Sequence, residues 1–230
     1  VSEGNLNVRV KTTSRDEVAV LANSFNEMVG NVSQSKQDLL NAYNKTIEGW
    51  SMALDLRDHE TEGHSRRVTE MTLQLAQRFN IRGEALENIR RGALLHDIGK
   101  IGIPDSILLK KGSLTDEEYE FMKQHPLFGH DFMKQIEFLD SAIDIPFSHH
   151  EKWDGSGYPQ GLKREEIPLA ARIFAIVDVW DAITKDRPYR KAMSFMEAKK
   201  IIEDGNGTHF DPIVAHEFLK MIEEKVNKEN

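Results

Sequence analysis

The sequence predicts an all-α fold, and two observations support that prediction. Apolar residues recur at alternating steps of three and four, the spacing that places them on one face of an α-helix. Runs with this spacing cover residues 18–32, 39–54, 64–75 and 86–96. Two irregular stretches, 100–114 and 151–168, are rich in glycine and proline and are bounded by predicted helices. We therefore expect a helical bundle that is preceded by a long coiled-coil-like helix.

The first predicted helix carries an apolar seam of the coiled-coil type. The seam consists of Val18, Leu21, Phe25, Met28 and Val32. A single helix would leave this stripe in water, so we expect it to pair with the same helix of a second copy in a parallel homodimer. A short polar connector, residues 4–16, precedes the helix.

A polar run, residues 33–38, interrupts the seam, and the apolar stripe then resumes with a shifted phase. The second stripe consists of Leu39, Tyr43, Ile47, Trp50 and Leu54. We interpret residues 33–48 as a linker helix that transmits rotation, and the second stripe as a continuation of the dimer seam. Further along, Thr115 and Glu118 have the spacing of a capping box and predict a helix start.

The composition narrows the function. The 230 residues carry a formal net charge of -8, which gives no electrostatic support for binding a nucleic-acid polymer. The chain has no cysteine, so any metal ligands must be histidine, aspartate or glutamate. No apolar run approaches the roughly 20 residues that span a bilayer, so we expect no membrane contact within this chain.

The strongest local signal is LLHDIGKIGIPD, residues 94–105, in which His96 and Asp97 close an apolar helix and Lys100 follows. Buried ionisable groups need a partner, and a bound metal is the most economical one. The dipeptide alone is weak evidence, because His130 and Asp131 repeat it in a context that we interpret as incidental.

Other candidate ligands are placed where a helical metal site needs them. Glu60 and His64 lie one turn apart and can face the same object. The others are His125, His149, His150 and Asp178. A histidine taken singly is more often structural, whereas the joint presence of these residues predicts a metal centre.

These motifs together resemble the HD-GYP domain, a subgroup of the HD metal-dependent phosphohydrolases. The resemblance covers about residues 48–225. It is carried by Arg57, Asp58, Thr61, Gly63 and His64, then by residues 96–105, 125–126, 149–151, 154–159, Asp178, 187–190 and 210–212. The start of the chain resembles the second half of a HAMP signalling module, on Asp16, Glu17, Leu21, Phe25, Asn26 and Met28. We therefore divide the chain into a partial HAMP module (1–32), a linker helix (33–48) and an HD-GYP catalytic domain (49–230).

The resemblance implies a phosphodiesterase that hydrolyses cyclic di-GMP to pGpG or onward to GMP. The family's metal ligands carry over to His64, His96, Asp97, His125, His149, His150 and Asp178, with Asp97 bridging two metals. Glu60 implies a third metal, because trinuclear members have glutamate four residues before the first histidine. Iron is the expected metal and manganese a competitor. The alternative for Glu60 is a surface ion pair with Arg57 or Arg66.

The same resemblance assigns catalytic and substrate-binding residues. Lys100, beside Asp97, is expected to stabilise charge on the leaving oxygen, and its alternative role is a salt bridge to that carboxylate. The expected substrate-binding residues are Tyr158, Gly157, Arg187 and Arg190.

Two other functions remain open on the sequence. One is a degenerate member that binds cyclic di-GMP or a GGDEF-domain protein without hydrolysis, and the other is an enzyme for another cyclic dinucleotide or a nucleotide monophosphate. The HAMP resemblance further implies the cytoplasmic region of a larger inner-membrane sensor protein.

Overall fold

The computed structural model describes residue 6 and residues 8–13, 16–58, 63–186 and 191–229, and within them it is helical without a β-strand. The prediction of an all-α fold is therefore confirmed. The α-helices are α1 (Glu17–Asp58), α2 (His64–Arg78), α3 (Gly83–Leu94), α4 (Asp105–Leu108), α5 (Asp116–Met122), α6 (His125–Met133), α7 (Asp144–Ser148), α8 (Leu169–Thr184), α9 (Phe195–Asp204) and α10 (Pro212–Glu229). Three 3₁₀ helices join them, η1 (Ile98–Gly102), η2 (Glu137–Ala142) and η3 (Arg164–Glu166). The chain divides into two compact units, residues 1–46 and 47–230.

In the first unit, the connector runs beside α1 and is bonded to it through Asn26. The amide of Asn26 accepts from the Val10 N–H at 2.8 Å and donates to the Val10 carbonyl at 2.9 Å. This face of α1 buries Ala22 and Val29, whereas the predicted seam residues Leu21 and Met28 are 71% and 53% exposed. These seam side chains are therefore exposed to solvent in a single chain, as expected for a helix that pairs with a second helix.

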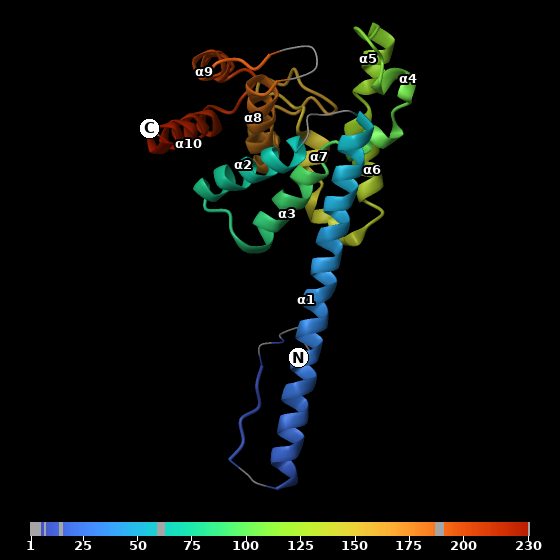
Figure 1. The fold of residues 1–230 in the computed structure, drawn as a ribbon, viewed down its shortest axis with the longest axis vertical. Helices are drawn as coiled ribbons and strands as arrows, with labels where there is room; N and C mark the ends of the chain where they lie inside the picture. Colours follow the sequence, from blue (N-terminus) through green and yellow to red (C-terminus); the bar gives the residue numbers. More distant parts are fainter. Residues whose placement is uncertain (1–5, 7, 14–15, 59–62, 187–190, 230) are drawn as a thin grey trace. The chain divides into compact units, whose positions relative to one another are not determined.

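The second unit is organised around α8, an apolar helix that contacts α2, α7, α9 and α10 (Figure 1). Because α8 is apolar on nearly all sides, it belongs in the interior of a bundle. Its buried Phe174 and Val177 pack in one cluster with Leu75 of α2 and Phe218 of α10. This core fixes α2 against α8, and the first residue of α2 is His64.

The last part of α1 belongs to the second unit and corrects part of the predicted dimer seam. Ile47 and Leu54 are only 2% and 5% exposed within their own chain. Ile47 packs with Leu95 and Met133, and the Trp50 ring meets Phe132 edge-on at 5.7 Å. The interior of the chain's own second unit therefore covers Ile47 and Leu54, which are not available to a second copy, whereas Trp50 is 37% exposed.

Candidate metal centre

The His96-Asp97 pair is brought to the centre of the domain by a close contact between η1 and α6. A Cβ on Gly99 would lie 1.8 Å from the carbonyl oxygen of His125, so only glycine allows this approach. The contact sets His125 against Asp97, with Nε2 of the imidazole 3.3 Å from Oδ1 of the carboxylate. The glycine of the HDIGK motif is thus a packing requirement of the site.

The first candidate ligand group joins Asp97, His125, His149 and His150, whose donor atoms all lie within 4.8 Å of one another. His149 Nε2 is 3.9 Å from Asp97 Oδ1 and 3.4 Å from His125 Nε2. Asp97 directly precedes η1, His125 begins α6, and His149 and His150 directly follow α7. The group therefore joins segments that are far apart in the sequence.

Backbone carbonyls fix the orientation of these rings. His125 Nδ1 contacts the Met122 carbonyl at 3.0 Å, and His149 Nδ1 contacts the Ile145 carbonyl at 3.0 Å. A carbonyl oxygen only accepts, so each Nδ1 carries the proton and each Nε2 of a neutral ring presents a lone pair. Two such lone pairs facing at 3.4 Å repel, and a cation between them removes the repulsion. The residues present therefore fit a metal ion.

The electrostatics agree with this donor set. Burial lowers the pKa of His149 to about 3 and also lowers the pKa of His125, so both rings stay neutral. Burial alone would raise the pKa of Asp97, but the charges of Lys100 and His96 hold it well below its usual range. Neutral imidazoles around an ionised carboxylate are typical ligands of divalent transition metals.

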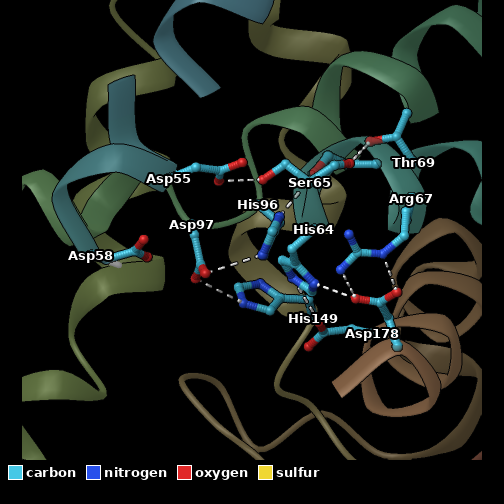
Figure 2. Close-up of polar contacts among 12 residues, drawn as sticks. Asp55, Asp58, His64, Ser65, Arg67, Thr69, His96, Asp97, His149 and Asp178 are labelled. Atoms are coloured by element: carbon cyan, nitrogen blue, oxygen red, sulfur yellow. Dashed lines mark hydrogen bonds and ion pairs between the residues drawn. The ribbon is translucent and has the colours of Figure 1, made fainter. Parts of the chain in front are cut away.

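The second candidate group joins His64, His96 and Asp178, again with donor atoms within 4.8 Å of one another. His64 Nε2 lies 3.4 Å from Asp178 Oδ1, and Figure 2 shows His64, His96, Asp97 and His149 turned toward one another. His64 can begin α2 at this point because Gly63 before it adopts a left-handed conformation, φ 72°. His96 Nε2 also lies 3.1 Å from Asp97 Oδ2, which joins the two groups.

Lys100 is held between two carboxylates at the edge of the centre. Its ammonium lies 2.6 Å from Asp97 Oδ2 and 3.1 Å from Asp58 Oδ2. The salt bridge to Asp97 that was expected as the alternative role of Lys100 is therefore present. This contact fixes a positive charge next to the candidate ligands.

The glycine-rich loop places Tyr158 over the first group. The phenol ring stacks on His150 with centroids 4.7 Å apart and planes at 27°. The buried Glu151 carboxylate shapes this loop by accepting the N–H groups of Gln160 at 2.7 Å and Leu162 at 3.1 Å. A Cβ on Gly157 would lie 2.3 Å from the Lys152 nitrogen, so the loop is too tight for another residue there.

Three predicted site residues, Glu60, Arg187 and Arg190, lie outside the described residues. His130 belongs to neither candidate group and contacts Asp131 at 3.0 Å, in agreement with its interpretation as incidental. Two partners of the centre were not predicted from the sequence, the partly buried Arg67 and the buried Asp181, although Asp181 follows Asp178 by one helical turn.

The fold and these groups define an all-helical domain built around a buried histidine–aspartate centre. Residues 49–214 match the HD-domain family model, and residues 1–34 match the HAMP-domain model. The chain therefore belongs to the HD-domain family. Phosphohydrolases of this family are metal-dependent, and the two groups supply residues that could hold the metal.

Named relatives are similar over most of this chain. A cyclic di-GMP phosphodiesterase of Vibrio cholerae is 40% identical over 98% of this chain and 49% of its own length. A cyclic di-GMP phosphodiesterase of Thermotoga maritima is 41% identical over 78% of this chain and 50% of its own length. The chain thus spans about half the length of these relatives. A solved V. cholerae phosphodiesterase specific for cyclic GMP-AMP has a TM-score of 0.63 at 20% identity, covering 77% of this chain and 48% of its own, which shows the fold alone.

Proposed function

We propose that this chain carries the catalytic domain of a metal-dependent phosphodiesterase that hydrolyses cyclic di-GMP to pGpG or GMP. The observation that carries the proposal is the position of the Asp97 carboxylate between the two ligand groups. Its Oδ2 faces His96 at 3.1 Å, and its Oδ1 faces His125 at 3.3 Å. A carboxylate in this position fits the role of a bridge between two metals.

The proposed ligands follow the two groups: Asp97, His125, His149 and His150 for one metal, and His64, His96, Asp97 and Asp178 for the other. When bound, such a metal pair supplies an activated water at neutral pH and neutralises charge on the phosphate. Lys100, held beside Asp97, places a further cation where the leaving 3′ oxygen gains charge. Tyr158 and Arg187 would hold the nucleotide by stacking and by paired hydrogen bonds.

We propose iron as the metal, with a third ion held with the help of Glu60. Support comes from the ligand set, since histidine and carboxylate bind iron, manganese and several other divalent ions. Metal analysis of anaerobically purified protein tests both points. Two equivalents of metal in wild-type protein, unchanged in the Glu60→Ala variant, would refute the trinuclear proposal.

Cyclic di-GMP is favoured as substrate because the V. cholerae and T. maritima relatives are cyclic di-GMP phosphodiesterases. The solved phosphodiesterase of the same fold is specific for cyclic GMP-AMP, so this cyclic dinucleotide is the second substrate to test. Incubation of metal-loaded protein with a panel of cyclic dinucleotides, followed by chromatography of the products, separates these substrates. Binding without turnover of any of them would instead support the non-catalytic module.

We further propose that the seam over residues 18–32 forms a parallel homodimer, and that the chain is the cytoplasmic region of a membrane sensor. The exposed Leu21 and Met28 support the dimer. The HAMP match indicates a signalling protein, and no helix among the described residues is long and apolar enough to cross a membrane. A GGDEF-domain partner and the division at residues 32 and 48 also remain predictions. Sedimentation of the whole chain as a monomer at micromolar concentration would refute the dimer.

A further inference from the structure

A partly buried ion pair between Arg67 and Asp181 lies directly behind His64. Arg67 Nε donates to Asp181 Oδ1 at 2.8 Å, and Nη2 donates to Oδ2 at 2.9 Å. Asp181 Oδ2 also contacts His64 Nδ1 at 2.8 Å. The Asp181 and His64 side chains are only 3% and 2% exposed, so water competes little for the bond between them.

The pair arises from two helices that each contribute residues one turn apart. His64 and Arg67 share a face of α2, and Asp178 and Asp181 share a face of α8. Where the two helices pack together, the first residue of each pair enters the second ligand group and the other lies behind it. The ligand and its support are thus built from the same two helical turns.

This contact decides which His64 nitrogen carries a proton. Both Asp181 oxygens accept hydrogen bonds from Arg67, and Oδ2 also faces His64 Nδ1, so the carboxylate acts only as an acceptor. His64 Nδ1 therefore carries a proton, and Nε2 points at Asp178 Oδ1 from 3.4 Å. Nε2 therefore faces the proposed ligand Asp178, while Nδ1 is bonded to Asp181.

We infer that Asp181 and Arg67 are positioning residues that fix the ring orientation and tautomer of His64 for metal binding with His96 and Asp178. A carboxylate behind a ligating histidine is a common way to fix the ring and raise its basicity. The inference rests on the proposed metal-dependent function and assigns this support to two residues that do not touch the metal or the substrate.

Arg67 has a separate task within the pair. Asp181 alone would add a further buried negative charge close to Asp178, which burial and repulsion would penalise. The guanidinium cancels that charge and takes both carboxylate oxygens, so the acceptor for His64 cannot rotate. Asp181 can then orient His64 without changing the net charge of the centre.

The alternative role for the pair is structural: a protonated His64 held between Asp178 and Asp181 that ties α2 to α8 and has no part in metal binding. Substitution of both charged partners separates the two roles. Replacing one partner of a buried pair leaves an uncompensated charge, whereas replacing both by apolar residues of similar volume is often neutral for stability. The double variant Arg67→Met/Asp181→Leu therefore removes the support of His64 with the smallest effect on folding.

The experiment measures Mn²⁺ binding to the whole chain, with free Mn²⁺ followed by electron paramagnetic resonance, and thermal unfolding of the chelator-treated protein. The variants are the double variant and Asp181→Asn, which keeps an oxygen for His64 but cannot accept both Arg67 donors. Arg172→Met is the matched control, because Arg172 also pairs with a buried carboxylate, Asp211 at 2.6 Å, and neither residue belongs to a ligand group.

We expect Asp181→Asn and the double variant to bind one Mn²⁺ equivalent about 10- to 100-fold more weakly than wild type, and every other equivalent normally. The double variant should unfold near the wild-type temperature after chelation, and Arg172→Met should lose stability but keep every wild-type Mn²⁺ affinity. Wild-type affinity in both Asp181 variants, with only their stability changed, would establish the structural role and overturn the inference. Wild-type protein that binds no Mn²⁺, Fe²⁺ or Zn²⁺ would overturn the proposed function itself.

Discussion

Substitution of Arg57 tests which bonds hold the end of α1 against the segment that carries Lys100. Its guanidinium donates to the Lys100 carbonyl at 2.9 Å, the Ile103 carbonyl at 2.7 Å and Asp105 Oδ1 at 2.8 Å. The first two bonds join the last turn of α1 to η1 and the residue after it. We therefore expect Arg57→Ala to loosen η1 as well as destabilise the domain.

The size of the effect follows from exposure. A hydrogen bond from a charged group contributes about 1.5–3 kcal/mol, and the low end applies because the Arg57 side chain is 32% exposed. The Asp105 carboxylate is 68% exposed, so its ion pair adds about 0–1 kcal/mol. The two carbonyl bonds then dominate, and Arg57→Ala should lower the free energy of unfolding by about 2–4 kcal/mol.

Urea unfolding of the chelator-treated protein measures this loss, with Arg66→Ala as the matched control. Among the residues that the structure describes, Arg66 pairs with Glu70, and the two side chains are 84% and 58% exposed, so the control should change stability by about 0.5 kcal/mol or less. Arg57→Lys should recover only part of the loss, because one ammonium cannot span three acceptors. A loss in Arg57→Ala no larger than that of the control would refute the reasoning.

Three further predictions follow from the centre. Gly99→Ala should strongly destabilise the domain and weaken metal binding, because its Cβ would lie 1.8 Å from the His125 carbonyl oxygen. In the control Gly49→Ala, no atom lies within 4 Å of the added Cβ, so urea unfolding should show unchanged or increased stability. Lys100→Ala should lower turnover more than metal content, and equal loss of both would contradict its proposed role. Burial lowers the pKa of His149 from 6.5 to about 3. Between these two pH values, the His149 imidazole therefore gains a proton in the unfolded chain but not in the folded chain. Chelator-treated protein should therefore lose about 2 kcal/mol of stability from His149 between pH 7 and 5, and constant stability would refute this.

Local rules were sufficient where a helix depends on its own residues. The Thr115–Glu118 capping box is present, with the Thr115 N–H donating to Glu118 at 2.7 Å and the Glu118 N–H donating to Thr115 at 3.3 Å. The seam was harder, because periodicity reports that a face is apolar but does not say what covers it. Ile47 and Leu54 fit the same pattern as Leu21, yet a core within the chain covers them.

The candidate ligands could be found from the sequence because each has the chemistry of a metal donor and lies in a recognisable motif. Their convergence could not be read there, since it depends on how α2, α6, α7 and α8 pack. The glycine at position 99 illustrates the difference. The sequence shows only that a glycine follows the predicted helix. The contact with the His125 backbone shows that this glycine allows two ligand segments to approach each other.

Asp178 and Asp181 show why a supporting residue is harder to find than a ligand. Both are carboxylates on one face of one helix, and no local signal separates them. Packing does: the Asp178 side chain is 26% exposed and faces His64 Nε2, whereas Asp181 is 3% exposed and faces His64 Nδ1. Each carboxylate thus faces a different nitrogen of the same imidazole, and this difference makes Asp178 a proposed ligand and Asp181 its support. Because His64 and Asp181 are 117 positions apart, that division belongs to the tertiary structure alone.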